Sequence, residues 1–124
     1  MMAIERFEDL KGLTLTKVDG TKGGESMIFT LENGERYSLY HAQDCCESVY
    51  IEDVVGDLND LVGSPLTMAE EVSNSDNPPD GYDDNDSFTW TFYKLATVKG
   101  YVTVRWFGTS NGYYSESVDF EKVR

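Results

Sequence analysis

The chain has 124 residues, enough for one domain with a hydrophobic core, and 40% of them are hydrophobic, which excludes a wholly disordered chain. Its formal net charge of −13 excludes a protein that binds nucleic acid or an anionic membrane through clustered Lys and Arg. No apolar run reaches the roughly 18 residues of a membrane span, and residues 1–9 carry acids where a signal peptide needs bases. We therefore expect a single domain, residues 1–124, in the cytoplasm of the cell that makes it.

The N-terminal third predicts three strands. Residues 13–18 and 27–31 have the β-branched content and the partial alternation of strands. Asn33-Gly34 follows the second run and precedes another alternating run, and this arrangement is the strongest short hairpin signal. We expect a hairpin over residues 26–41. The side chains that share one face of its second strand are Tyr37, Leu39 and His41.

The middle of the chain predicts mixed structure. Residues 49–51 have the pattern of a strand, and residues 57–62 that of a short helix, which Gly63-Ser64-Pro65 ends. Residues 65–72 predict a strand or an extended edge. Residues 73–86 predict an exposed loop, because almost none of their side chains suits a core.

The C-terminal third predicts an antiparallel meander. Its first strand, residues 87–95, alternates so that Phe88, Trp90 and Phe92 lie on one face. Two more strands are expected at residues 101–107 and 113–120, after turns at residues 99–100 and 108–112. The predicted fold is therefore α+β: a mostly antiparallel sheet of two hairpin-bearing flanks, with a short helix in the middle segment.

Acidic residues are concentrated in that middle segment. The 57 residues between Arg36 and Lys94 contain 13 acids and no Lys or Arg, whereas the rest of the chain contains 10 acids and 10 bases. Such a block is typical of a face that meets a basic partner or mimics the phosphate backbone of DNA. It is equally typical of a solvated surface that keeps a protein soluble.

The only histidine and both cysteines lie within residues 41–47. A thiolate beside a histidine is a nucleophile, and His41, Asp44 and Cys45 are of types that bind zinc. However, no second Cys or His pair exists to complete a four-ligand site. The alternative is that both thiols are small core side chains and that His41 is hydrogen-bonded in the sheet. We expect the thiols to stay reduced, because a vicinal disulfide closes a strained eight-membered ring and the cytosol is reducing.

The chain carries no motif of a common enzyme class. It has no P-loop, no dinucleotide-binding glycine fingerprint, no nucleophile elbow and no paired-histidine zinc helix. We therefore expect a binding protein with no catalytic residues, no cofactor and no resident metal. A metal- or thiol-dependent enzyme at His41 and Cys45 is the alternative.

Residues 105–115 combine an arginine, aromatic rings, hydroxyl groups and two turn glycines. Such a set suits a flat ligand, because aromatic faces stack on a base, arginine forks onto a phosphate, and amides or hydroxyls read polar edges. The alternative is a hairpin whose aromatic side chains pack on the sheet and whose Asn111-Gly112 serves only the turn. The candidate ligand-binding residues are Arg105, Trp106, Asn111, Tyr113, Tyr114 and Ser115, with His41 as a further member.

Two strings, Asp44-Cys45-Cys46-Glu47 and Asn111-Gly112-Tyr113-Tyr114-Ser115, carry a family resemblance. With them and with Gly63-Ser64-Pro65 and Arg105-Trp106, the chain resembles an uncharacterised family of small proteins that is frequent in tailed-bacteriophage genomes. The resemblance covers nearly the whole chain. It implies a phage origin and expression in the cytoplasm of a host bacterium, where small phage proteins often counter host defence.

Three hypotheses follow for the function. The first is an anti-defence protein that sequesters a small nucleotide signal of host immunity, in a pocket lined by residues 105–115 and His41, with a pocket between protomers of a homo-oligomer as one arrangement. The second is an acidic, DNA-mimic-like inhibitor that binds a basic host defence protein through residues 37–93. The third is the metal- or thiol-dependent enzyme.

Overall fold

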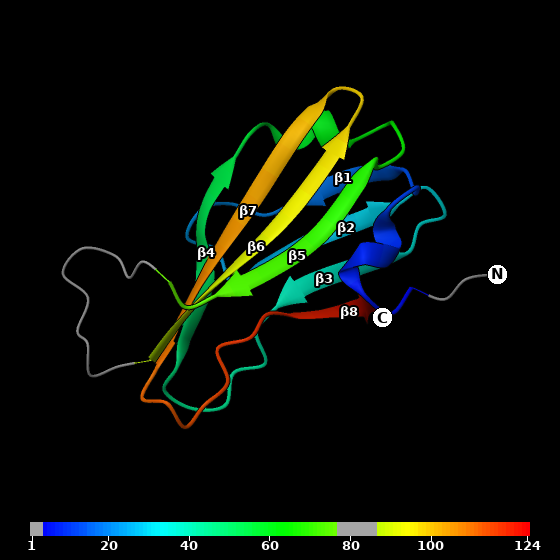
Figure 1. The fold of residues 1–124 in the computed structure, drawn as a ribbon. Helices are drawn as coiled ribbons and strands as arrows, with labels where there is room; N and C mark the ends of the chain where they lie inside the picture. The colour runs from blue at the N-terminus through cyan, green and yellow to red at the C-terminus, as the bar shows by residue number, and fades with distance from the viewer. Residues whose placement is uncertain (1–3, 77–86) are drawn as a thin grey trace.

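The computed structural model describes residues 4–76 and 87–124, and these residues form two four-stranded antiparallel sheets (Figure 1). The first sheet has the strand order β1-β2-β3-β8 and the second the order β4-β7-β6-β5. The first sheet is made of β1 (Leu15–Asp19), β2 (Ser26–Leu31), β3 (Arg36–Tyr40) and β8 (Asp119–Val123). The second is made of β4 (Ser48–Val55), β5 (Met68–Asn74), β6 (Ser87–Thr97) and β7 (Gly100–Ser110).

The mostly antiparallel sheet that the sequence predicts is confirmed, but the helical part of the α+β prediction is not. In the described residues the helical elements are two single 3-10 turns, η1 (Phe7–Leu10) and η2 (Leu58–Leu61). The Asp57 side chain caps η2 by accepting a hydrogen bond from the Asn59 N–H, as in a helix start. The η2 turn ends at Leu61 because the backbone of Val62 is extended and forms a β-bridge with Leu15. The two layers therefore form a β-sandwich.

The predicted hairpin over residues 26–41 is confirmed. β2 and β3 pair antiparallel, with Met27 opposite Leu39 and Phe29 opposite Tyr37. The connection places Gly34 at a φ of 88°, a region that L side chains rarely adopt. The Asn-Gly signal therefore marks the turn correctly, and the alternation sets which side chains enter the core.

The predicted C-terminal meander is wrong at its last strand. β6 and β7 form a hairpin as expected, with Trp90 opposite Phe107 and Leu95 opposite Val102. The third strand of the meander was expected at residues 113–120, but the chain crosses to the other sheet and β8 pairs with β3. Periodicity does not specify a strand's partner. In the structure β8 also packs on β3 through Phe120, whose ring centroid lies 5.5 Å from that of Tyr37 in a stacked arrangement.

The strand bounds of the middle segment also differ from the prediction. β4 is eight residues long instead of three, and β5 is an edge strand that extends to Asn74, inside the predicted loop 73–86. Residues 77–86 of that predicted loop lie outside the described residues. None of the helical elements in the described part has the length or the apolar character that a bilayer-spanning helix needs.

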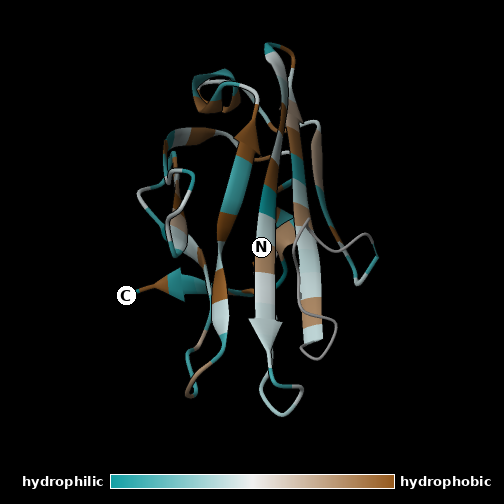
Figure 2. Ribbon diagram, turned by 90° about the vertical axis from the view of Figure 1, so that its left-hand side faces the viewer, coloured by the Kyte–Doolittle hydropathy of each residue, from teal (hydrophilic) through white to brown (hydrophobic). Residues whose placement is uncertain are grey.

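The core lies between the two sheets and draws on both. Hydropathy alternates along the long strands (Figure 2), so that each sheet turns one apolar face inward. In β7 the inward side chains Val102, Val104 and Trp106 are completely buried. In β6 the inward positions belong to Thr91, Tyr93 and Leu95, whereas Phe88, Trp90 and Phe92 lie half-buried on the outer face.

Candidate functional site

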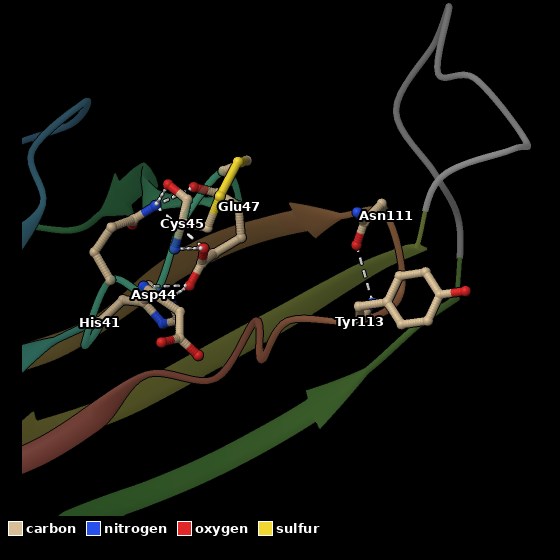
Figure 3. The surroundings of a disulfide bond; sticks show 8 residues. His41, Asp44, Cys45, Glu47, Asn111 and Tyr113 are labelled. Carbon is tan, nitrogen blue, oxygen red and sulfur yellow. Dashed lines mark hydrogen bonds and ion pairs between the residues drawn. A yellow bond between two sulfur atoms is a disulfide. The ribbon is translucent and has the colours of Figure 1, made fainter.

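Two loops meet at one end of the sandwich. Residues 41–47 connect β3 to β4, and residues 111–118 connect β7 to β8; both lie at the lower end of Figure 1. We refer to residues 41–47 and 109–117 as the loop-end site. It contains most of the residues that the sequence singles out (Figure 3).

A buried carboxylate organises the first loop. The Glu47 side chain has no exposed surface. Its Oε2 accepts hydrogen bonds from His41 Nε2 at 2.7 Å and from the Asp44 N–H at 2.9 Å, and its Oε1 accepts one from the Cys45 N–H at 2.9 Å. Gln43 Nε2 lies 3.3 Å from Oε1 and donates to the Glu47 carbonyl at 2.6 Å. The loop is thus folded around one carboxylate.

His41 joins this loop to the second one. Its Nδ1 lies 2.6 Å from the Ser117 carbonyl oxygen, while Nε2 faces the Glu47 carboxylate. Both partners are acceptors, so the doubly protonated imidazolium is the form that satisfies both contacts. Burial opposes this charge, but the bonds to Glu47 and Ser117 outweigh it and raise the pKa of His41.

The hydrogen bond with His41 also shifts the pKa of the Glu47 carboxyl group, but downward. Burial alone would raise the pKa of Glu47, but the hydrogen bonds from His41, Cys45 and Asp44 lower it to about 2. Both shifts favour the ionised forms, the imidazolium of His41 and the carboxylate of Glu47. As an ion pair, the two side chains pin residues 41–47 against residue 117.

The two cysteines are not core thiols, which corrects that expectation. Both side chains belong to exposed residues, and their sulfur atoms are joined in a vicinal disulfide (Figure 3). The expectation that they stay reduced is thus not met in this structure either. Within residues 4–76 and 87–124, no three His, Cys, Asp or Glu side chains are grouped to hold a metal ion.

A second buried carboxylate fixes the loop after β7. Glu116 Oε1 accepts a hydrogen bond from Thr89 Oγ1 at 2.8 Å, and Oε2 accepts one from Ser110 Oγ at 2.5 Å. Gly108 permits this approach, because a Cβ there would lie 2.8 Å from the Glu116 carbonyl oxygen. The missing side chain lets residue 116 lie directly on the backbone of β7.

A small cavity opens between the two loops. It has a volume of about 240 Å³ and is lined by Cys46, Thr109, Ser110, Asn111 and Tyr114. Its wall offers hydroxyl groups, an amide, an aromatic ring and the disulfide, and no charged side chain. Such a wall suits a neutral ring with polar edges more than a free phosphate.

Arg105 and Trp106 lie apart from this cavity. The Arg105 guanidinium binds Glu52, with Nη2 2.5 Å from Oε2, and lies 3.8 Å from Asp53 Oδ2. It also lies over the Trp90 ring, 5.3 Å from the centroid, on the outer face of the second sheet. Trp106 points into the core with no exposed surface.

The remaining candidates lie in or beside the second loop. Asn111 lines the cavity and its Oδ1 accepts a hydrogen bond from the Tyr113 N–H at 3.0 Å. Tyr114 lines the cavity as well, whereas Tyr113 is 90% exposed. Ser115 Oγ lies 2.7 Å from Ser117 Oγ, close to the carbonyl that His41 binds. The structure therefore brings Asn111 and Tyr114 together with Cys46.

Sequence reasoning missed the two residues that organise this end, Glu47 and Glu116. Each is an acid that is almost fully buried, and each binds donors from segments distant in sequence or from its own loop. One acid six residues after a histidine is too common a pattern to predict the hydrogen bond between His41 and Glu47. Only the position of Glu47 directly before β4 points to a structural role.

Comparison with known proteins gives one match. No curated protein and no solved structure matches the chain. A family model described as "Domain of unknown function (DUF7448)" matches residues 8–120. That range includes both sheets except the last three residues of β8, and it includes the whole loop-end site. The chain therefore belongs to the DUF7448 family.

Proposed function

We propose that the protein is a phage-encoded anti-defence factor that binds and sequesters a small nucleotide immune signal in the cytoplasm of its bacterial host. The loop-end site is its binding site. The observation that carries the proposal is the cavity at which Asn111 and Tyr114 meet, beside loops that hydrogen bonds already hold in place. A pre-organised site loses less conformational entropy on binding than a floppy one.

The state of the reactive residues favours binding over catalysis. Both ring nitrogens of His41 are occupied by acceptors, so the histidine offers no free base. Cys45 and Cys46 are joined in a disulfide, so neither presents a thiolate. A thiol enzyme needs a thiolate within reach of a base. These contacts support a binding protein instead.

The size and polarity of the cavity indicate which part of a nucleotide enters it. Sites for drug-sized ligands usually measure roughly 300–1,000 Å³, and this cavity has about 240 Å³. It therefore accepts a base, which can stack on Tyr114 and bond to Asn111, while the phosphates remain in solvent. Two acids of the block, Asp44 and Glu47, belong to the loop-end site itself, and Glu47 is paired with His41. Charges of the block that lie farther than about 8 Å from the cavity are screened at physiological salt.

The test is calorimetric titration with cyclic dinucleotides and cyclic ADP-ribose isomers. We expect binding by the wild-type protein and a loss of affinity of about tenfold or more for Tyr114→Ala, because stacking on one base contributes about 1–3 kcal/mol. The matched control is Tyr101→Ala, which removes a half-exposed tyrosine from the opposite end of β7. Native mass spectrometry of protein purified from bacteria would show a nucleotide adduct.

Two results would contradict the proposal. One is a flat titration with every nucleotide, together with a purified protein whose native mass is that of the bare chain. The other is an equal loss of affinity in Tyr114→Ala and Tyr101→Ala, which would place the ligand elsewhere.

An acidic inhibitor of a basic host protein is a second candidate. The observation that favours it is the position of the acidic block on the second sheet, where Glu70 and Glu71 lie exposed on the edge strand β5. Four further acids of the block, Asp80, Asp83, Asp84 and Asp86, lie outside the described residues. Consecutive residues of a strand point to opposite faces, so the carboxylates of Glu70 and Glu71 flank the exposed edge of the sheet, where they attract a basic surface over a range that salt shortens.

Neutralising the exposed acids tests this candidate. Against a basic, nucleic-acid-binding defence protein, we expect Glu70→Gln with Glu71→Gln to weaken binding several-fold at low salt and less at high salt. The control is Glu25→Gln with Glu32→Gln, a pair of exposed acids outside the block. Equal binding by all variants, or the same loss in the control pair, would exclude docking through β5.

A further inference from the structure

A second cavity of the described residues lies away from the loop-end site. It is a half-open groove of about 800 Å³ beside η1 and the β2–β3 turn. Glu35 and Tyr37 line it at the start of β3, whereas His41 follows the end of that strand. The five residues of β3 therefore separate the two sites by about 15 Å.

One wall of the groove is a fixed polar network. The Glu35 carboxylate accepts hydrogen bonds from Asn33 Nδ2 at 2.8 Å and from the Tyr37 hydroxyl at 3.0 Å. Lys122 Nζ, from β8, lies 2.9 Å from Oε2 of the same carboxylate. Three segments of the chain thus hold Glu35 and, through it, the ammonium group of Lys122.

Two acids and two lysines line the groove, and both acids already accept hydrogen bonds from the chain: Glu35 from Asn33 and Tyr37, and Asp9 from the backbone N–H groups of Glu5 and Arg6. The lysines keep free donors. Lys122 uses one of its three N–H donors on Glu35. Lys11, which also lines the groove, has an exposed side chain, and no ion pair of the described residues engages its ammonium group. An incoming group that accepts hydrogen bonds and carries negative charge therefore matches this rim.

The rest of the groove is apolar. Ile4 and Leu13 are partly buried against the core, and Leu31 and the ring of Tyr37 are each only 4% exposed. These side chains line the groove together with the two lysines. A volume of about 800 Å³ falls within the roughly 300–1,000 Å³ that small-molecule sites have.

We propose that this groove binds a small amphipathic carboxylate, with its hydrocarbon or aryl body on Leu13, Leu31 and Tyr37 and its carboxylate between Lys11 and Lys122. The proposal concerns a site distinct from the loop-end site and does not depend on the function proposed there.

The electrostatics of the groove support the assignment. The hydrogen bonds from Lys122 and Tyr37 lower the pKa of Glu35, and the bond to Glu35 raises the pKa of Lys122. Burial raises the pKa of Tyr37, and backbone hydrogen bonds from Arg6 and Glu5 lower the pKa of Asp9, another lining residue. Perturbed groups that gather in one concavity are typical of binding sites.

The test is calorimetric titration of the full chain with two probes, decanoate and 2-naphthoate, which separate an aliphatic from an aryl preference. We expect one molecule to bind per chain and Lys11→Ala to weaken binding about tenfold, the usual effect of losing one charge-assisted hydrogen bond. The matched control is Lys94→Ala, which makes the same charge change on β6, in the other sheet, and should leave the affinity unchanged.

A second variant tests the apolar part of the groove. Leu13→Trp places a larger side chain in the cavity and should abolish binding while circular dichroism shows an unchanged melting curve. If that variant does not fold, chemical-shift mapping of the wild-type protein replaces it, and shifts confined to the groove residues support the proposal.

The proposal is overturned if neither probe binds, if Lys94→Ala weakens binding as much as Lys11→Ala, or if the shifts map to another surface. Because the nucleotide titrations depend on Tyr114 and these titrations on Lys11, failure of one proposal is distinguishable from failure of the other.

Discussion

Replacing Trp106 by alanine is expected to lower the free energy of unfolding by about 3–5 kcal/mol, the range for removing a large aromatic side chain from a core. The side chain has no exposed surface and packs between the sheets among the inward residues of β7. For a domain whose total stability is about 5–15 kcal/mol, this loss is a large fraction. Urea unfolding followed by circular dichroism measures it.

Two matched variants separate packing from a binding role. The Trp106→Phe variant should lose much less unfolding free energy than Trp106→Ala. The indole Nε1 donor has no hydrogen-bond partner among the described residues, so its removal breaks no hydrogen bond. The Trp90→Ala variant should also lose less unfolding free energy, since Trp90 lies half-buried on the outer face of the second sheet. If Trp106→Ala kept wild-type stability but lost ligand binding, Trp106 would be a recognition residue and the core assignment would be wrong.

The second large effect concerns pH and the His41–Glu47 ion pair. The Glu47 carboxylate has a folded pKa of about 2 against an ordinary value of 4.5, so it contributes stability above pH 4.5 that is lost as the pH falls toward 2. His41 has a raised folded pKa, so its contribution is complete below its ordinary value of 6.5 and is lost as the pH rises through the folded pKa. The pair therefore stabilises the fold most between pH 4.5 and 6.5.

Breaking the pair should have a large effect in that window. Glu47→Gln leaves the buried His41 cation without a counter-charge and deprives two backbone N–H groups of a carboxylate. Removing one partner of a buried pair is strongly destabilising, and we expect the melting temperature to fall by roughly 10 °C or more at pH 6. Melting curves recorded from pH 2 to pH 9 measure the whole profile.

The differences between variants isolate the pair from the other titrating groups. Glu35 and Asp9 also have lowered pKa values, so the wild type loses stability in acid for more than one reason. The gap between wild type and Glu47→Gln should narrow toward pH 2, and the gap between wild type and His41→Gln should narrow above the folded pKa of His41. If the melting temperatures of wild type, Glu47→Gln and His41→Gln differed by the same amount at every pH, His41 and Glu47 would not be coupled.

The two proposed sites differ in what a sequence can reveal of them. Asn111 and Tyr114 lie in a string that turn chemistry and composition already mark, and the structure places both at one cavity. Lys11, Glu35 and Lys122 are isolated charged residues in three separate segments, and no pattern connects them. Lys122 reaches Glu35 because β8 pairs with β3 and so brings Lys122 opposite Tyr37, and Lys11, which follows η1, lines the same groove.

The sequence by itself determined the β-rich class, the β2–β3 hairpin, the alternation of β6 and β7, and the acidic character of the middle segment. These features depend on local chemistry: side chains alternate across a strand, Asn-Gly favours a turn, and charge is counted directly.

Tertiary structure alone decided the rest. It placed Trp106 in the core and Arg105 on Glu52, moved β8 to the first sheet, and buried Glu47 and Glu116 under loops. Apart from the burial of Glu47, whose partners lie in its own loop, each of these outcomes is a contact between residues far apart in sequence or a choice of which face meets the core. Such contacts depend on the packing of both sheets together, and local periodicity carries no information about them.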